Sequence, residues 1–266
     1  MIRALLPGTV VGVDLFGDAP EGVLLPAEEA VVAGVAAGRR REFATVRLCA
    51  RRALRELGGG PGAAADADSG TGAPGGVALL HDADGVPVWP DGVVGSMTHT
   101  RGYRAAAVAR AADVARLGID AEPDRPLRDG VLATIATPAE LAGGAGGAGA
   151  GDGVCRDRLL FCAKEAAYKA WFPHARVRLG FRDVEVSFDD RAASGGRFTA
   201  RVRHGDGELP LGRRGRSAGR CGDGAGGRPP AGGTLTSAEL APGRAPAHGP
   251  EPAPGTPGGG GHSTGA

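Results

Sequence analysis

The 266-residue chain is poor in lysine, in aromatic side chains and in long apolar runs. Aromatic residues make up only 4% of it, and all of them lie between Phe16 and Phe198. No apolar run approaches the roughly 20 residues that a membrane-spanning helix needs, which excludes a transmembrane protein. The N-terminal stretch MIRALLPGTVVGVDLFG is interrupted by Asp14 and Gly17 and is followed by no convincing cleavage site, so we expect no signal peptide.

Cysteine and net charge are also low. The four cysteines, Cys49, Cys155, Cys162 and Cys221, show no CxxC spacing. This favours reduced thiols in the cytoplasm over a disulfide framework. The net charge is only +1, which is not typical of a nucleic-acid-binding protein. We therefore expect a cytoplasmic protein that binds neither nucleic acid nor a membrane.

Glycine and proline, in contrast, are abundant, with 49 and 20 residues. They are concentrated in the last 60 residues, which hold 18 Gly, 9 Pro and no aromatic residue. Such a segment buries too little apolar surface to offset its conformational entropy, so we predict that 207–266 is a disordered tail. The 206 residues before it are enough for one domain or two small lobes with a hydrophobic core.

The hydrophobic periodicity predicts an α+β fold. Helices are expected over 27–57, 130–142 and 157–172, the last ended by Pro173. Strands are expected over 93–98, 104–109, 114–122, 181–188 and 197–203, with a hairpin around Asp84-Gly85. The Gly-rich stretches 58–76 and 143–153 are predicted to be loops. Because helix-then-strands occurs twice, we expect two similar lobes, 1–112 and 113–206.

Lysine supplies only two of the 31 Lys and Arg residues, and both lysines lie in one segment, at Lys164 and Lys169. Chance in a GC-rich coding sequence would explain this. A need for an amine would explain it equally well, because Lys can transfer a proton and Arg effectively cannot. On the predicted helix, Glu165 and Lys169 share a face, and an exposed ion pair worth about 0.3–0.5 kcal/mol is the alternative to a functional role.

Two carboxylates lie close together in the predicted strand GIDAEP. Side chains two positions apart on a strand point to the same face, so Asp120 and Glu122 project together while Ile119 and Ala121 face the core. Paired carboxylates suit a hard cation such as Mg²⁺, particularly when phosphates complete its coordination shell. A solvated pair at a strand end is the more common outcome.

Two other groups of residues suit phosphate. Ser96 and His99 lie in and after a predicted strand, and a histidine can donate to a phosphate, although a lone histidine is more often structural. Six arginines of the first predicted helix stand out, at 39, 40, 41, 47, 51 and 52. The planar guanidinium group recognises phosphate, but a solvated helix face explains most of the six.

The order of the motifs is more specific than any one of them. Over residues 28–203 the chain contains, in this order, GRRREF, R-x-CARRAL, GVPVWPDGVVGSMTH, GIDAEP and LLFCAKEAAYKAWFP. This arrangement resembles the 4′-phosphopantetheinyl transferases of the surfactin-synthetase and enterobactin-synthetase type, with a close likeness to their actinobacterial and mycobacterial branch. GID-x-E and F-x-AKEA-x-YKA together are highly specific.

The resemblance implies a Mg²⁺-dependent enzyme that moves the 4′-phosphopantetheine arm of coenzyme A (CoA) to a serine of an apo acyl or peptidyl carrier protein. Adenosine 3′,5′-bisphosphate is the other product. The implied fold is a pseudo-two-fold pair of α+β lobes with CoA in the cleft between them. The implied partners are CoA and a carrier of fatty acid, polyketide, siderophore or peptide synthesis, and we expect a monomer.

The resemblance also implies an acidic and a catalytic set of residues. Asp120, Glu122 and Glu165 match the family's Mg²⁺ site on the CoA pyrophosphate, and Lys169 matches a lysine near the transferred phosphate. Of these, Asp120, Glu165 and Lys169 are also expected to bind CoA. We expect Glu165, directly or through a metal-bound water, to take the proton of the serine, and Lys169 to stabilise the phosphate or protonate the leaving oxygen.

A second set is implied for the rest of CoA. Ser96 and His99 match a loop that contacts the CoA phosphates. Arg39 and Arg47 match arginines around the adenosine 3′-phosphate. Leu179 matches a backbone contact late in the site.

Two departures from the family pattern stand out. In the hairpin before the WP motif, the family's basic residues are replaced by His81, Asp82 and Asp84, so CoA contacts there are not expected. Family members usually end with a G-R-W segment and a closing strand, whereas this chain continues LPLGRRGRSAGRCGDGAGG, which would remove an edge strand of the second lobe. The alternatives are therefore a catalytically silent member that still binds CoA or carrier protein, and a metal-dependent phosphohydrolase that uses the same carboxylates.

Overall fold

The computed structural model describes residues 1–59, 76–123, 125–145, 155–189 and 196–204, and the backbone of three further strands. These strands are β7 (Gly207–Gly212), β8 (Gly215–Ala218) and β9 (Gly233–Leu240). No helix within these ranges is long and apolar enough to cross a membrane. Most of the two predicted Gly-rich loops, 58–76 and 143–153, lies outside the described residues.

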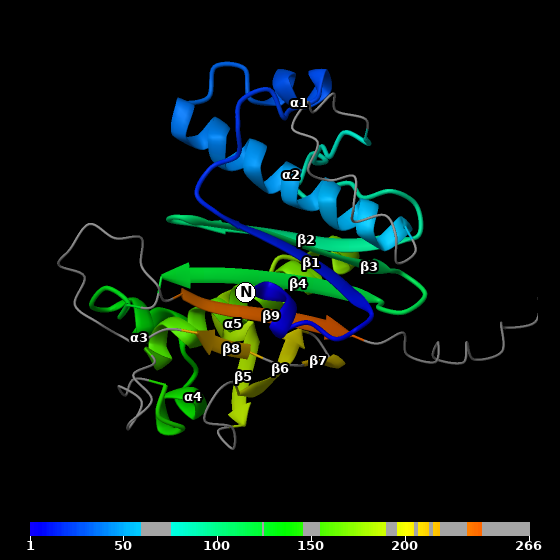
Figure 1. The fold of residues 1–266 in the computed structure, drawn as a ribbon. Helices are drawn as coiled ribbons and strands as arrows, with labels where there is room; N and C mark the ends of the chain where they lie inside the picture. Colours follow the sequence, from blue (N-terminus) through cyan, green and yellow to red (C-terminus); the bar gives the residue numbers. More distant parts are fainter. Residues whose placement is uncertain are drawn as a thin grey trace, which may run out of the picture.

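The first α+β unit is an antiparallel sheet covered by a long helix (Figure 1). Its strands, in the order β1-β3-β2, are β1 (Val10–Phe16), β3 (Tyr103–Arg110) and β2 (Val93–Thr100). The helices are α1 (Pro26–Val31) and α2 (Ala37–Gly58), and a 3₁₀ turn, Ile2–Ala4, precedes β1. Cys49 and Ala50 of α2 pack against Ala106, in the middle of β3. Alternate residues of β3, such as Ala105 and Ala107, belong to a second core on the other face, so the central strand is buried on both sides.

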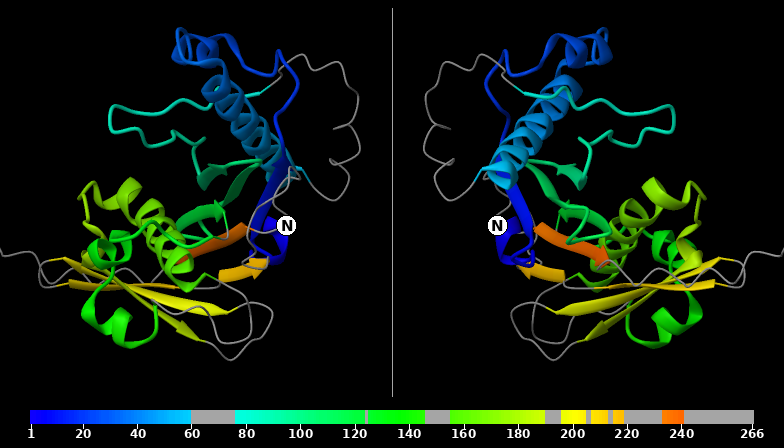
Figure 2. Two further views of the ribbon diagram at one scale, coloured as in Figure 1. Left: turned by 90° about the vertical axis from the view of Figure 1, so that its left-hand side faces the viewer. Right: turned by 90° about the vertical axis from the view of Figure 1, so that its right-hand side faces the viewer.

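The second unit lies beside the first, with α2 in the upper part and helix α5 (Arg156–Ala175) in the lower part of Figure 2. One of its sheets has the order β4-β9-β8, with β4 at Arg116–Pro123, and the other has the order β5-β6-β7. Its remaining elements are α3 (Val131–Ile135), α4 (Pro138–Ala142), a 3₁₀ turn (Phe181–Asp183), β5 (Val184–Asp189) and β6 (Arg197–His204). The α+β class and two-unit organisation expected from the sequence are confirmed.

Helix α5 lies unusually close to β4 because both surfaces are made of small residues. Ala163, Ala166, Ala167 and Ala170 of α5 are fully buried. A Cβ atom at Gly118 of β4 would come within 2.0 Å of the Ala166 carbonyl oxygen and 2.6 Å of the Ala170 nitrogen, so only glycine fits there. The glycine of the GIDAE motif therefore lets the strand with Asp120 and Glu122 approach the helix with Glu165 and Lys169.

Three predicted helix boundaries differ from the structure. The expected helix over 27–57 is interrupted between α1 and α2, where Gly34 has a φ of +79°. The expected helix over 130–142 is two short helices, because Thr137 caps α4 and restarts the chain. Pro173 does not end α5, which continues to Ala175. A proline so near a C-terminus removes only one helical hydrogen bond, and the chain leaves the helix at Arg176.

The predicted tail differs most. β9 pairs antiparallel with the whole of β4, from Arg116 opposite Leu240 to Pro123 opposite Gly233. The sequence analysis did not predict β7, β8 and β9 within 207–266, and the rest of that range lies outside the described residues. The edge of β4 that the sequence left unpaired is covered, because main-chain pairing needs no particular side chains.

Candidate functional site

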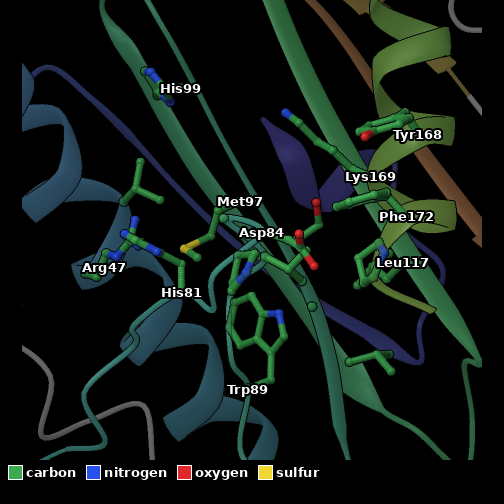
Figure 3. Close-up of a pocket in the computed structure, with 18 of the residues that line it drawn as sticks. Arg47, His81, Asp84, Trp89, Met97, His99, Leu117, Tyr168, Lys169 and Phe172 are labelled. Atoms are coloured by element: carbon green, nitrogen blue, oxygen red, sulfur yellow. The ribbon is translucent and has the colours of Figure 1, made fainter. Parts of the chain in front are cut away.

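A cavity of ≈ 530 Å³ is lined by residues of both units. In Figure 3 its walls come from α2 on one side and α5 on the other, with β2 between them. The chain has few aromatic residues, but four line this cavity: Phe43, Trp89, Tyr168 and Phe172. The cavity also gathers five residues that the sequence analysis singled out: Arg39, Arg47, Ser96, His99 and Lys169. It therefore combines apolar surface with positive charge.

Arg47 is a nearly buried cation in the cavity wall. Its side chain is only 8% exposed, and its guanidinium carbon lies 3.6 Å from the centre of the Phe43 ring. Its Nε donates to the carbonyl oxygen of Leu79 at 3.2 Å. Burial lowers the pKa of Arg47 to about 10, with Glu28 opposing the shift. Arg47 therefore remains charged at neutral pH and is available to an anion.

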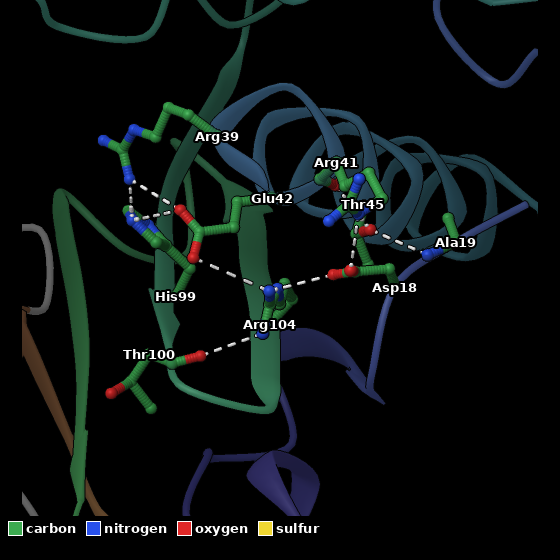
Figure 4. A network of polar contacts seen from close by, with 9 residues as sticks. All are labelled: Asp18, Ala19, Arg39, Arg41, Glu42, Thr45, His99, Thr100 and Arg104. Atoms are coloured by element: carbon green, nitrogen blue, oxygen red, sulfur yellow. Dashed lines mark hydrogen bonds and ion pairs between the residues drawn. The ribbon is translucent and has the colours of Figure 1, made fainter. Parts of the chain in front are cut away.

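His99 and Arg39 belong to a polar network that surrounds Glu42 (Figure 4). Arg39 donates to Nε2 of His99 and to Glu42 at 3.0 Å. Glu42 also lies 3.6 Å from both His99 and the buried Arg104, which in turn pairs with Asp18 at 2.9 Å. Burial and the charge of Arg39 lower the pKa of His99, against the opposing effect of Glu42. His99 is therefore a neutral ring that accepts from Arg39.

Ser96 joins the two units. Its hydroxyl oxygen accepts the backbone N–H of Ile119 at 3.0 Å, and the Thr98 hydroxyl oxygen accepts that of Ala121 at 3.2 Å. β2 and β4 are thus joined by side-chain hydroxyls at alternate positions. The Thr98 hydroxyl also donates to Oδ1 of Asp120 at 3.1 Å. This contact holds the first carboxylate of the GIDAE motif beside β2.

Asp120 and Lys169 form the contact between β4 and α5. Lys169 Nζ donates to Oδ1 of Asp120 at 2.7 Å. The other carboxylate oxygen, Oδ2, is buried and has no hydrogen-bond partner within the described residues. Burial lowers the pKa of Lys169, but the charge and hydrogen bond of Asp120, together with Glu165, raise it overall. Lys169 is therefore a protonated amine at the cavity wall, paired with Asp120 across two elements and not along the helix with Glu165.

Glu122 and Glu165 share the electrostatic surroundings of Asp120. Burial and then the charge of Asp120 raise the pKa of Glu165, and Lys169 opposes the shift. Burial, Asp120 and Glu165 raise the pKa of Glu122, and Arg158, which donates to Glu122 at 3.1 Å, opposes the shift. The three carboxylates that the sequence separates are thus close enough to destabilise one another's charge.

The three carboxylates fit a divalent cation by the type of their donor atoms and not by their present arrangement. Within the described ranges, no group of three or more His, Cys, Asp or Glu side chains is arranged as metal ligands. Asp120 pairs with Lys169, and Glu122 pairs with Arg158. Carboxylate oxygens are nevertheless the hard donors that Mg²⁺ prefers. The buried Oδ2 of Asp120, which has no partner in the part of the chain that the structure describes, is free to serve as one.

Lys164 has a different environment from Lys169. Its side chain is 1% exposed and lies 2.8 Å from the Glu140 carboxylate. Its Nζ also donates to three backbone carbonyl oxygens at 2.8 to 2.9 Å, those of Ile135, Phe181 and Val184. Of the two lysines that the sequence singled out, Lys164 is therefore a packed structural cation.

Several lining residues were missed from the sequence. Tyr168 and Phe172 extend the cavity wall along α5, and Trp89 packs over Gly95, where a Cβ atom would come within 2.6 Å of the indole ring. The rarity of aromatic residues was a signal that could have identified them. Leu179, in contrast, packs against the core of the second unit and is not among the residues that line the cavity.

The fold and the site define an α+β protein of two units with a mixed apolar and basic cavity. Lys169 in its wall contacts Asp120, but Asp120, Glu122 and Glu165 are not among the residues that line it. Residues 27–109 match the 4′-phosphopantetheinyl transferase N-terminal domain family, and residues 116–210 match the 4′-phosphopantetheinyl transferase superfamily. Known relatives cover most of the chain. The 4′-phosphopantetheinyl transferase Svp of Streptomyces mobaraensis is 49% identical over 205 residues, which are 76% of each chain.

Two further relatives carry the same description. PptT of Mycobacterium tuberculosis is 43% identical over 207 residues, 76% of this chain and 84% of the relative. Npt of Nocardia iowensis is 42% identical over 203 residues, 75% of this chain and 82% of the relative. The chain belongs to the 4′-phosphopantetheinyl transferase family and is an enzyme of that class.

Proposed function

We propose that the protein transfers the 4′-phosphopantetheine arm of CoA to a serine of an apo acyl or peptidyl carrier protein, with Mg²⁺, and releases adenosine 3′,5′-bisphosphate. The observation that carries the proposal is the Asp120–Lys169 pair: Lys169 lines the basic, aromatic cavity, and the buried Oδ2 of Asp120 has no partner among the described residues. A basic wall suits the phosphates of CoA, and an acidic cluster suits a cation on its pyrophosphate.

The basic and aromatic residues account for CoA binding in this proposal. Arg39, Arg47 and His99 would contact phosphate oxygens, because guanidinium and imidazole groups donate well to phosphate. The aromatic lining would cover uncharged parts of CoA. Ser96 and the backbone of Leu179 remain predicted CoA contacts.

The acidic end accounts for the chemistry. Asp120, Glu122 and Glu165 would hold Mg²⁺, which supplies neutralising charge for the pyrophosphate. Glu165 would accept the proton of the carrier serine, and its raised pKa makes it a stronger base than an ordinary carboxylate. The serine oxygen then bonds to the β-phosphorus of CoA as the bond to the bisphosphate oxygen breaks. Lys169, oriented by Asp120, would stabilise the phosphate oxygens or protonate the leaving oxygen.

Incubation of the protein with CoA, Mg²⁺ and several purified apo carriers tests the proposal. Mass spectrometry should show one phosphopantetheine arm on a carrier, and EDTA should abolish the gain until Mg²⁺ is restored. Binding of CoA or carrier without a mass gain would favour the silent family member. Phosphate release from CoA without a carrier would favour the phosphohydrolase.

The variant Glu165→Gln tests whether Glu165 is the base that accepts the serine proton. The variant should lose most of its transfer rate even at saturating Mg²⁺, because an amide cannot accept the proton. Transfer at the wild-type rate would remove Glu165 from that role. The identity of the carrier, the monomeric state and the cytoplasmic location remain predictions.

A further inference from the structure

One side of the cavity is formed by a hairpin, residues 79–88, whose turn is organised by Asp82. Oδ1 of Asp82 accepts the backbone N–H groups of Asp84 and Val86, both at 3.0 Å. The Asp82 N–H donates to the Val86 carbonyl oxygen at 2.9 Å. Gly85 has a φ of +82°, a conformation that favours glycine. The hairpin is therefore a defined element, and Asp84 and Val86 are among the residues by which it lines the cavity.

The hairpin belongs to the first unit but is attached to the second. Val86 is buried in the second unit's core, which also contains Trp171 and Phe172. Arg176, in the left-handed conformation at the end of α5, lies 2.6 Å from Oδ2 of Asp82 and 3.1 Å from Oδ2 of Asp84. One guanidinium group thus pairs with two carboxylates across the two units.

These ion pairs contribute little to stability, because Arg176 and Asp84 are 45% and 50% exposed and such pairs are weak in water. Their position matters more than their strength. Asp84 lines the cavity and is half exposed to solvent, and Asp82 lies beside it in the turn, so both charges lie at the solvent-exposed edge of the cavity, here called its rim. Charges on the rim of a cleft change the local concentration of a charged ligand and its association rate over about one Debye length.

The balance of charge at this rim depends on Arg176. The hydrogen bond from Arg176 lowers the pKa of Asp82, and the pairing with Asp82 raises the pKa of Arg176, so both groups stay charged at neutral pH. Without Arg176, the carboxylates of Asp82 and Asp84 would lie at the rim without this cation. They would repel any ligand that carries several phosphates.

We infer that Arg176 is a positioning residue that admits a polyphosphate substrate, because it neutralises Asp82 and Asp84 at the rim of the cavity. It does so without contacting the reacting atoms. The inference rests on the proposed function, since CoA is the polyanion in question.

Steady-state transfer from CoA to an apo carrier tests the inference with Arg176→Gln at low and high salt. At about 20 mM salt the KM for CoA should rise about three- to tenfold with kcat unchanged, and the effect should shrink at about 0.5 M salt because the rim charges are screened. The triple variant Arg176→Gln, Asp82→Asn, Asp84→Asn should return the KM to within about twofold of the wild type. Asn at 82 keeps an oxygen to accept the turn N–H groups.

Arg3→Gln is the matched control, because Arg3 forms an exposed pair with Glu56 and neither residue lines the cavity. An unchanged KM in Arg176→Gln would overturn the inference. A raised KM that persists in the triple variant, or that is the same at low and high salt, would also overturn the inference. Arg176 would then have a purely structural role. The CoA Kd, measured by calorimetry, gives the same comparison without turnover. A wild-type protein that binds CoA but transfers nothing would contradict the proposed function alone.

Discussion

Helix α5 carries two lysines, Lys164 and Lys169, that each pair with a carboxylate from another element. The two pairs differ in how many of their polar atoms have hydrogen-bond partners. In the Lys164–Glu140 pair every charged atom is used: Lys164 reaches three carbonyl oxygens besides Glu140. Glu140 accepts the backbone N–H groups of Thr137 and Val186, each at 2.7 Å. Burial lowers the pKa of Lys164 in spite of Glu140. This pair ties α5 to α3, α4 and β5 and has no capacity for a ligand.

The Lys169–Asp120 pair, in contrast, leaves one carboxylate oxygen without a hydrogen-bond partner in the described part of the chain. Asp120 uses one oxygen for both Lys169 and Thr98, while its buried Oδ2 has no partner in the described part of the chain. Buried polar groups are nearly always hydrogen-bonded, so an orphaned oxygen next to a cavity indicates a position for a ligand. The comparison teaches that unused hydrogen-bonding capacity, more than residue type, separates the pair that we propose to be functional from the structural one.

The largest effect should come from breaking the saturated pair. Lys164→Met leaves Glu140 charged and buried and leaves three carbonyl oxygens without a donor, so the free energy of unfolding should fall by about 3–5 kcal/mol. Chemical denaturation measures this loss. The double variant with Glu140→Gln should be more stable than additivity predicts, because it removes both charges. A loss below about 1 kcal/mol would contradict the structural role.

Asp120→Asn should act on turnover instead. Removing the charge that orients Lys169 should lower kcat/KM for CoA by about 10²- to 10³-fold, the usual cost of a lost electrostatic contact in an active site. The thermal midpoint should stay close to that of the wild type. Asp113→Asn, at an exposed residue before β4, is the control. An Asp120 variant that keeps more than a tenth of the activity would refute the assignment.

Thr98→Val should produce a smaller effect, because it removes one hydrogen bond to Asp120 and leaves the Ala121 N–H without an acceptor. We expect a loss of about 1–3 kcal/mol in unfolding free energy and a several-fold lower kcat/KM. Thr98→Ser keeps the hydroxyl and should behave like the wild type in both assays. Equal losses in the two variants would show that packing at this position matters more than the hydroxyl.

The smallest effect concerns pH. Burial and Arg39 lower the pKa of His99, so the ring is neutral at pH 7, and a bound phosphate would raise that pKa. Binding then takes up a proton, and the affinity for CoA should increase as the pH falls from 7.5 to 6, relative to His99→Gln. Calorimetry in buffers of different ionisation enthalpy measures the proton uptake. Identical pH profiles for the two proteins would exclude a role for His99 in this linkage.

Much of the framework could be predicted from local patterns. Period-two alternation located β5 and β6, and short apolar runs located β2, β3 and β4. The resemblance carried by the motif order identified five residues that line one cavity. The partners of Lys164 could not be predicted, because they come from four separate elements. Neither could Glu42, since periodicity marks a charged helix residue only as polar. Contacts set by tertiary packing leave little trace in local sequence.

Strand β9 could not be predicted from amino-acid composition either. Its neighbours are rich in glycine and proline, which favours disorder on average. The strand exists because β4 offers a row of main-chain donors and acceptors more than a hundred residues earlier in the chain. A composition-based prediction cannot include that partner.

Strand β4 is synthesised long before its partner β9. Asp120 lies opposite Thr236 and Glu122 opposite Thr234, so the strand that bears both carboxylates remains half-paired while most of the polypeptide is still leaving the ribosome. Nascent chains that stop before β9 would present a bare strand to other molecules in the cell. The acidic cluster therefore gains its β9 partner only after residues 233–240 have been synthesised.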